Sequence, residues 1–506
     1  MTDDAIVEPG GGGLGSGVFW TFTMLAASTV SQVFIVAFAV REIGPADFGL
    51  FAIVASVVSL MLVIDFGLSV SVVREVVAAR TGDAAARERG LTNLRKLNGA
   101  LWTSAGLALS LTAVASAVLP WLLEAQGRRL QVAGTTALVG VAIALSFATA
   151  VLPGSMTAHQ RFDVGAIGSL TGTVTRVVVV VALLPHVGLL GLGLSTLLAV
   201  VVERAVIAVW ARRIAPWVSV RPGRTNMGDL LHARESSGPV VALSASAQLL
   251  TTSDMFVIGA LRPAEGAGLY RTGVVLPSQA IAALFAFYNA ALPLLSSSHD
   301  GKSQEDSTRL LSRLLNLVCG MVFAWMAFSR HELTGALVGH PSDLAAKVLV
   351  LYCAVNVCNA VVHPTAFLLM ARGQARVMSR MVPLEISLNL GLTVGLVLSL
   401  GPVGAAWATL ATTAFLDFVV FPVVGRGQFQ RRHLTALVQD GALPAILGGL
   451  AAAASVGLAE ILGAPNPALT AVLTGVVGLS AGAAMSGRAD RQALTALFRR
   501  PTIDGA

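Results

Sequence analysis

The chain has 506 residues, of which 55% are hydrophobic and only 12% are charged, with a formal net charge of +7 at pH 7. A soluble globular chain carries about twice that share of charged residues. The composition therefore excludes a soluble globular protein and indicates a chain that crosses a membrane many times. The three cysteines lie in apolar runs and show neither metal-site spacing nor a disulfide framework.

Residues 1–17 are acidic and glycine-rich, without the basic region of a signal peptide, and are expected to form a disordered cytoplasmic tail. Beyond them, apolar runs bounded by charge or by Gly and Pro predict about fourteen transmembrane helices, because about 20 apolar residues cross a bilayer. The expected spans are 18–40, 48–72, 99–121, 132–156, 164–184, 188–210, 239–261, 268–292, 311–329, 344–370, 381–400, 403–424, 441–462 and 467–486.

The distribution of Lys and Arg predicts the orientation of these helices. With the N-terminus inside, the cytoplasmic segments hold 24 of these residues and the outer loops hold 5. This bias places both termini in the cytoplasm of a multi-pass plasma-membrane protein. The basic loops lack interleaved aromatic residues, so they are interpreted as orientation signals and not as a nucleic-acid surface. The outer loops are too short to form a domain.

A stretch near the N-terminus combines several unusual features. Residues 41–47 form a polar segment with a Gly-Pro pair, which predicts a tight turn. The apolar run 48–72 follows and contains one acid, Asp65. An ionisable residue inside a span is costly and commonly faces a cavity or a partner.

Three short sequences recur along the chain at separations of 218, 214 and 213 residues. Residues 45–51 recur at 263–270, residues 160–161 at 374–376, and residues 188–197 at 401–410. Six predicted helices separate the copies, so the two halves have the same orientation, as in transporters with parallel repeats. The predicted domains are a six-helix bundle at 18–210, a cytoplasmic linker at 211–238, a second bundle at 239–424, two added helices within 441–486, and a cytoplasmic tail at 487–506.

The repeated segments resemble a known family. The sequence GPADFGLFAIVASVV followed by DFGL, and Asp254 within SDMFVIGALRPAEGAGLY, are similar to the polysaccharide-transporter (oligosaccharide flippase, Wzx-type) family. That family belongs to the multidrug/oligosaccharidyl-lipid/polysaccharide (MOP) exporter superfamily. The resemblance covers about residues 18–424. It implies two bundles around a central cavity, alternating access, and a polyprenyl-pyrophosphate-linked sugar as cargo.

Three arginines are candidates for binding the phosphates of such a cargo. Arg176 lies in the middle of the valine-rich span 164–184, Arg271 lies near the start of the span 268–292, and Arg41 lies at the end of the first span. A guanidinium can bind a phosphate through paired hydrogen bonds. The alternatives are a buried ion pair for Arg176, an interfacial anchor for Arg271 and a solvated residue for Arg41. Arg74 and Glu75 are interpreted as an interfacial ion pair.

Five residues are candidates for coupling transport to Na⁺ or H⁺: Asp65, Asp254, Glu385, Asn389 and Thr412. Glu385 and Asn389 share one helix face, and buried acids can carry a proton. The resemblance to lipid II flippases implies a cation site formed by four of the five, Asp65 being the exception. The alternative role for Asn389 and Thr412 is interhelical hydrogen bonding. No other cofactor or firm metal site is expected.

The sequence therefore predicts a non-enzymatic flippase for a lipid-linked oligosaccharide, with membrane lipid and, within the pathway, a polymerase or glycosyltransferases as partners. The alternatives are a small-solute or drug cation antiporter, a membrane glycosyltransferase or polymerase, and a scaffold in a polymer-export complex. The chain contains no Gly-x4-Gly-Lys-Ser/Thr phosphate loop, which argues against direct use of ATP.

Overall fold

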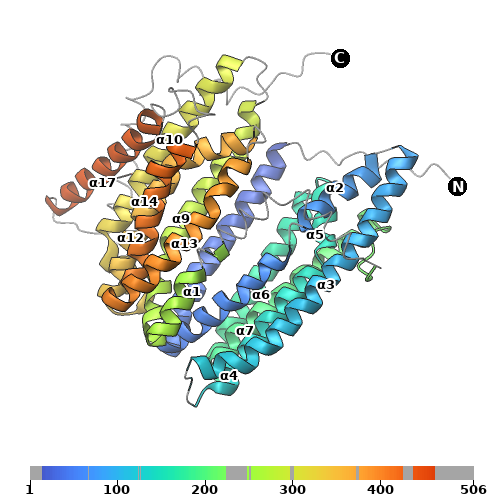
Figure 1. Ribbon diagram of the computed structural model, residues 1–506, viewed down its shortest axis with the longest axis horizontal. Helices are drawn as coiled ribbons and strands as arrows, with labels where there is room; N and C mark the ends of the chain where they lie inside the picture. The colour runs from blue at the N-terminus through green and yellow to red at the C-terminus, as the bar shows by residue number, and fades with distance from the viewer. Residues whose placement is uncertain are drawn as a thin grey trace. The chain divides into compact units, whose positions relative to one another are not determined.

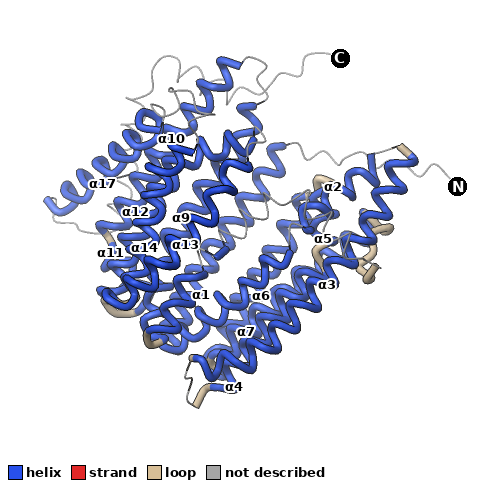
Figure 2. The backbone as a smooth tube through the Cα atoms, viewed as in Figure 1, coloured by secondary structure: helices blue, strands red, loops and turns tan. Residues whose placement is uncertain are grey.

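The computed structural model describes residues 14–65, 68–81, 83–123, 125, 127–223, 248–249, 252–296, 301–371, 375–424, 437–461 and 474. Throughout these residues the regular structure is helical, as Figure 2 shows, so the predicted all-α class is confirmed. The chain divides into two compact units, Met1–Gly268 and Leu269–Ala506. The predicted linker 211–238 lies largely outside the described residues.

The first unit is built around four long neighbouring helices, α3, α4, α6 and α7, which lie side by side in Figure 1. Its elements are α1 (Leu14–Ser59), the 3-10 helix η1 (Leu60–Asp65), α2 (Leu68–Thr81), α3 (Ala84–Leu122), α4 (Arg129–Ala148), α5 (Val151–Ala158), α6 (Phe162–Val187), α7 (Leu189–Ile214) and a short helix, Thr252–Leu261. A buried core of Leu101, Val151, Met156 and Ile207 joins α3, α5 and α7.

The second unit packs α10 against α12 and α17, and α14 against α12 and α13. Its elements are the greater part of α9 (Ala264–Ser296), α10 (Gly301–Phe328), α11 (Arg330–Val338), α12 (Asp343–Ala371), α13 (Ala375–Leu400), α14 (Val403–Phe415), the π-helix η2 (Leu416–Val420), α15 (Phe421–Val424), the π-helix η3 (Leu437–Ala442) and α17 (Leu443–Ile461). Phe323, Leu349 and Cys353 belong to its buried core.

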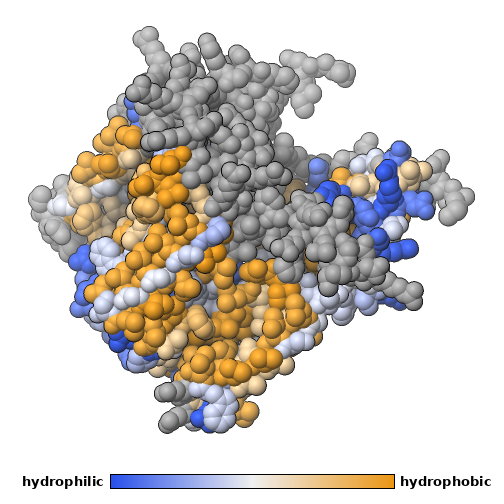
Figure 3. All heavy atoms as spheres, in the orientation of Figure 1, coloured by the Kyte–Doolittle hydropathy of each residue, from blue (hydrophilic) through white to orange (hydrophobic). Residues whose placement is uncertain are grey.

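Ten helices among the described residues are long and apolar enough to cross a membrane. One of them, Phe22–Ile64, covers most of both the first and the second predicted span, 18–40 and 48–72. The predicted span 467–486 lies almost wholly outside the described residues, so the total of fourteen stays a prediction. Figure 3 shows apolar side chains covering much of the visible surface of the described helices. Such a surface suits contact with lipid chains.

The predicted polar turn at 41–47 is a break of a single residue. Gly44 has φ 80° and ψ 162°, a backbone conformation that glycine adopts readily and other residues rarely adopt. The helix α1 resumes directly after it. Pro45 begins the resumed helix, where its missing N–H leaves no hydrogen bond unmade. Asp47 follows in the first turn, where a negative charge is favourable, and it forms an ion pair with Arg128.

Two predicted spans are interrupted where continuous helices were expected. The span 48–72 breaks at η1, and the Ser104 hydroxyl from α3 donates to the Ile64 carbonyl there, at 3.2 Å. The span 132–156 breaks at Thr149 and Ala150. Pro153 cannot donate to the Thr149 carbonyl, and the Leu152 N–H donates to it instead, at 3.0 Å. Both interruptions therefore leave the freed carbonyl with a protein donor.

The repeated glycine turns adopt the same local structure in both halves of the sequence. Gly188 between α6 and α7 has φ 56°, and Gly401 between α13 and α14 has φ 68°. Each turn carbonyl accepts from the glycine three residues later, Gly191 or Gly404, at 2.9 Å. The sequence repeat found at these positions is therefore also a repeat of backbone geometry.

The two copies of the Pro-Ala-acid motif pack against each other within the first unit. A Cβ atom on Gly49 would overlap the Ala264 carbonyl, and a Cβ atom on Gly268 would overlap the Pro45 carbonyl. In each case the glycine near the end of one copy meets a backbone carbonyl at the start of the other copy. Small residues allow membrane helices to approach this closely.

We expect Gly49→Ala and Gly268→Ala each to destabilise the protein by about 1–3 kcal/mol, because the added methyl group overlaps backbone. Gly165→Ala in α6 is the matched control, since its Cβ would meet nothing within 4 Å. Thermal unfolding of the purified protein in detergent measures the effect. Equal stability of the three variants would contradict the close packing.

Candidate functional site

Arg176 lies on the opposite face of α6 from the exposed apolar side chains of that helix. Val174, Val178 and Val181 are exposed and recur at helical spacing. Arg176 lies two residues from Val174 and from Val178, about 200° around the helix, and it is half-buried. The Arg176 side chain therefore leaves the helix on the face opposite to the exposed valines. This placement is expected, because exposing a guanidinium to lipid costs free energy.

A cavity of about 780 Å³ lies inside the first unit. It is partly open and falls in the size range of small-ligand sites. Four regions contribute its walls: the break between α4 and α5, the 3-10 helix η1, α2 and α7. The lining residues are Leu62, Val73, Arg74, Ser146, Phe147, Ala150, Pro153, Gly154, Thr157 and Arg204.

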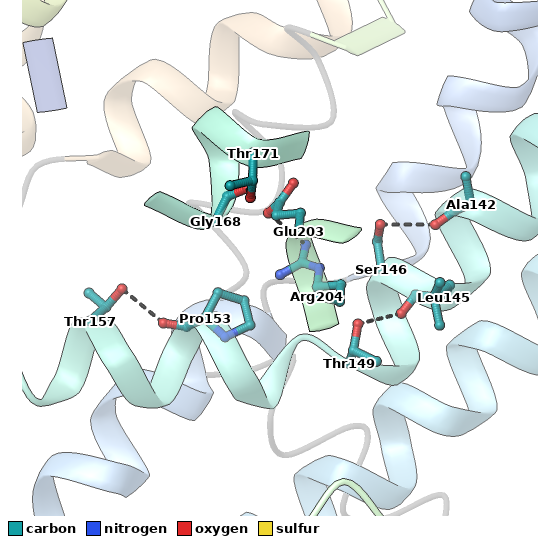
Figure 4. A network of polar contacts seen from close by, with 10 residues as sticks. All are labelled: Ala142, Leu145, Ser146, Thr149, Pro153, Thr157, Gly168, Thr171, Glu203 and Arg204. Atoms are coloured by element: carbon teal, nitrogen blue, oxygen red, sulfur yellow. Dashed lines mark hydrogen bonds and ion pairs between the residues drawn. The ribbon is translucent and has the colours of Figure 1, made fainter. Parts of the chain in front are cut away.

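Arg204 of α7 brings a guanidinium to this cavity, as Figure 4 shows. Its side chain is 18% exposed, and its Nε and Nη1 atoms are buried without a hydrogen-bond partner among the described residues. The one ion pair recorded for it, Nη2 to the Glu203 Oε1, is long at 3.9 Å. Glu203 packs beside Gly172 of α6. Arg204 thus has buried donors directed at no described protein acceptor.

The hydroxyl groups of the cavity already donate to backbone. Ser146 Oγ donates to the Ala142 carbonyl at 2.9 Å, and Thr157 Oγ1 donates to the Pro153 carbonyl at 3.1 Å (Figure 4). Their oxygens can still accept a hydrogen bond. Arg74 lies at the rim, is 59% exposed, and pairs with Glu75 at 3.2 Å, which confirms the predicted ion pair.

The other predicted phosphate ligands lie apart in the sequence and in different elements. Arg41 is exposed in α1, three residues before the Gly44 break. Arg271 is half-buried in α9 and interacts electrostatically with Tyr270 and Tyr352, whose hydroxyl groups are 2.9 Å apart. The role of these arginines in binding phosphate stays a prediction.

Arg204 was not among the predicted site residues, although the sequence carries a signal for it. It lies within the predicted span 188–210, as Arg176 lies within its own span. The exposed residues Val201 and Val209 of α7 mark the apolar face. Pro153 could have indicated the break at Thr149, but the sequence does not show that η1 and α2 also line the cavity beside Arg204.

In the second unit, α13 and α14 bring polar groups together. Asn389 is 1% exposed, and its Nδ2 donates to Thr409 Oγ1 at 3.4 Å. Thr412 is buried, and its hydroxyl has no hydrogen-bond partner among the described residues. The predicted alternative for Asn389, an interhelical hydrogen bond, is therefore present.

Asp417 extends this polar group beyond the predicted residues. It is the second residue of the π-helix η2, a form that is rare and frequent at functional sites. Its Oδ2 is buried without a hydrogen-bond partner within the described part of the chain, and Glu385 of α13 acts on it electrostatically. Two acids with a buried hydroxyl nearby could hold a proton or a hard cation.

The first unit contains two of the predicted acids, Asp254 and Asp65. Asp254 is 1% exposed in the helix Thr252–Leu261. One turn before the helix, Gln248 donates to Ser59 Oγ at 2.9 Å and its carbonyl accepts from Thr252. Asp65 ends the 3-10 helix η1. Ion coupling at these residues stays a prediction.

Outside the spans, Arg161 illustrates how the ends of the helices are held. Asp163 accepts from its Nε at 2.9 Å and from its Nη2 at 2.8 Å. These hydrogen bonds raise the pKa of the Arg161 guanidinium above its usual value. The guanidinium also lies 5.7 Å from the ring centroid of Trp210. The contacts fix the start of α6 against α7.

The ten long apolar helices among the described residues define a multi-pass membrane protein. Residues 14–299, more than half of the chain, match the family described as "Polysaccharide biosynthesis protein". The chain belongs to this family, which confirms the resemblance found in the sequence. No curated protein sequence matches the chain.

Three solved structures show the shared fold. The lipid II flippase MurJ, in an inward closed conformation, has a TM-score of 0.62 and 12% identity, covering 94% of this chain and 99% of that chain. An inward-facing multidrug resistance MATE family transporter of the MOP superfamily has a TM-score of 0.60 and 13% identity, covering 83% and 99%. An outward-facing MATE transporter has a TM-score of 0.53 and 14% identity, covering 84% and 97%.

If an ion gradient drives transport by this protein, Asp417→Asn is expected to leave the protein folded and to remove that dependence. The amide keeps the shape of the carboxyl group but cannot release a proton or neutralise a cation. Transport is measured with and without an imposed pH or Na⁺ gradient. Asp343→Asn, at an exposed helix start, is the control and should respond as the wild type does. Unchanged gradient dependence in Asp417→Asn would rule out a coupling role.

Proposed function

We propose that this chain is a flippase that moves a polyprenyl-pyrophosphate-linked oligosaccharide across the plasma membrane during cell-envelope polysaccharide synthesis. Membership of the polysaccharide biosynthesis protein family supports the pathway. The fold shared with a lipid II flippase supports the type of movement. The central observation is that Arg176 starts from the face of its span opposite to the apolar stripe.

A cationic site within a span suits this cargo physically. A guanidinium in the centre of a bilayer costs at least about 2.5–3.5 kcal/mol on insertion scales. A pyrophosphate offers several anionic oxygens that accept paired, charge-assisted hydrogen bonds. The anion and the cation thereby offset each other's cost of leaving water. Arg271 and Arg41 are the further residues proposed to contact the phosphates.

We propose alternating access, driven by an ion gradient, as the means of translocation. Asp254, Glu385, Asn389, Thr412 and Asp65 are the proposed coupling residues, with Na⁺ or H⁺ as the ion. The polar group around Asp417 supports this proposal because buried acids are expensive unless they bind a proton or a cation. A polymerase or glycosyltransferases are the proposed partners in the pathway.

A cation antiporter is the second candidate function. The MATE transporters share the fold, and Glu385 and Asp417 could attract a cationic solute. Arg176 and Arg204 oppose this reading, because like charge repels a cationic cargo. A membrane glycosyltransferase or polymerase would require acids placed for catalysis at an outer loop.

The proposed orientation has both termini in the cytoplasm. A cysteine introduced at the exposed residue Ala85, between α2 and the span of α3, should react with an impermeant thiol reagent only after permeabilisation. A cysteine at the exposed residue His340, between α11 and α12, should react in intact cells. Two of the three native cysteines are buried, which limits the background. The reverse labelling pattern would overturn the orientation.

We expect Arg176→Ala to leave the protein abundant in the membrane and to reduce translocation at least tenfold, on the order of the loss of one charge-assisted contact. Arg176→Lys should restore part of the activity, because it keeps the charge and loses the guanidinium fork. Accumulation of lipid-linked oligosaccharide on the cytoplasmic face reports the activity. Immunoblotting reports the abundance.

The control for this pair is Arg212→Ala, which removes an exposed charge from the last turn of α7. It should translocate as the wild type does. Normal translocation by Arg176→Ala at normal abundance would rule out the phosphate role. Loss of abundance together with activity would instead assign Arg176 to a buried ion pair.

A further inference from the structure

The cavity beside Arg204 holds a charged group whose donors exceed the acceptors that surround it. Two of the three guanidinium nitrogens, Nε and Nη1, are buried and make no hydrogen bond to a described residue. Leaving such donors unpaired in a low-dielectric interior is costly. The third nitrogen, Nη2, is less buried and has only the long ion pair with Glu203 Oε1 at 3.9 Å, so an anion in the cavity can bind the guanidinium there.

The size of the cavity separates a ligand from a few structural waters. Its volume of about 780 Å³ compares with about 30 Å³ for each water in the liquid. The volume is that of many waters, and the cavity is partly open, so there is room for a group much larger than a single water. A lipid head group with one or two phosphates fits the volume and reaches the guanidinium.

The chemistry of the walls selects an anion that also carries hydroxyl groups. A guanidinium offers donors and no acceptor, so Arg204 requires a ligand rich in acceptors. The Ser146 and Thr157 oxygens, whose protons point to backbone carbonyls, can accept from hydroxyl groups on the ligand. The remaining wall is largely apolar: Leu62, Val73, Phe147, Ala150 and Pro153.

Glu203 is the acid that competes with such an anion. Its Oε1 lies 3.9 Å from Arg204 Nη2, a separation at which the attraction is weak in a partly hydrated site. Arg74 at the rim adds a second guanidinium, although its Nε is engaged by Glu75. The anion therefore binds mainly through Arg204.

We infer that this partly open cavity, lined by η1, α2, the α4–α5 break and α7, is a binding site for the phosphate of a lipid head group, with Arg204 as its principal ligand. Two sources carry this chemistry: the pyrophosphate of a polyprenyl-linked cargo, and the phosphate of a membrane phospholipid. The cargo assignment rests on the proposed function, whereas the phosphate site itself does not.

The test uses the full-length protein in a glycoside detergent that carries no phosphate, and follows its thermal unfolding as ligand is added. A ligand that binds the folded state raises the melting temperature. The probes are a polyprenyl pyrophosphate, phosphatidylglycerol and inorganic pyrophosphate. We expect the polyprenyl pyrophosphate to stabilise the wild type, and Arg204→Met to weaken its apparent affinity by about tenfold or more.

Three further variants separate binding from folding. Arg213→Met removes a neighbouring exposed charge from the same helix and should bind as the wild type does. Arg204→Lys should retain part of the affinity. Glu203→Gln removes the competing acid and should tighten binding, a change that a purely structural Arg204–Glu203 pair does not produce. If Arg204→Met fails to fold, the Lys and Gln variants decide the outcome.

The outcomes are distinct. Equal stabilisation of the wild type and Arg204→Met by every probe overturns the site. Stabilisation by phosphatidylglycerol alone, lost in Arg204→Met, supports the site and assigns it to a membrane phospholipid. A wild type that binds through Arg204 but fails to translocate lipid-linked oligosaccharide contradicts the proposed function and leaves the phosphate site standing. If the wild type translocates the lipid and Arg204→Met binds every probe as the wild type does, the phosphate site is contradicted and the proposed function stands.

Discussion

A chain that crosses a bilayer must pair its peptide groups within its own helices, because hydrocarbon offers no hydrogen-bond partner. Departures from the regular helix are therefore tolerated where other protein groups, or water in a cavity, supply the hydrogen bonds that the helix has lost. In the first unit the 3-10 helix η1 is supported by Ser104, and the break at Thr149 borders the cavity. In the second unit the π-helix η2 carries the buried Asp417. The irregular backbone and the polar groups thus occur together.

The same constraint explains the placement of the arginines. A guanidinium inside a span persists where water, an acid or a ligand reaches it. The valine stripe of α6 faces outward while Arg176 starts from the opposite face, and Arg204 of α7 turns to a cavity walled by α2, α4 and α5. The close contact at Gly172, where an added Cβ would lie 2.9 Å from the Ala199 carbonyl oxygen, holds α6 against α7. The helices therefore provide an apolar exterior and keep their cationic groups for the interior.

The sequence predicted the helices well because apolar length is enough to identify a membrane span. The Gly-Pro pair at residues 44–45 predicted a break, and Pro153 could have indicated the one at Thr149, since proline cannot donate in a helix. Pro422 could likewise have indicated the π-helix at 416–420, since it cannot donate to the Phe418 carbonyl. The 3-10 helix at 60–65 contains neither glycine nor proline, so packing decides it. For the same reason Arg176 was singled out from its position alone, whereas Arg204 and Asp417 became candidates once their unpaired buried atoms were known.

The central claim is that the cargo is an anionic, lipid-linked glycan. The most direct measurement places the purified wild-type protein in liposomes that carry a polyprenyl-pyrophosphate oligosaccharide in one leaflet and follows its arrival in the other with an impermeant glycan-cleaving enzyme. The account predicts protein-dependent transfer of this lipid and no transport of a quaternary ammonium dye. Transport of the dye without transfer of the lipid would contradict it.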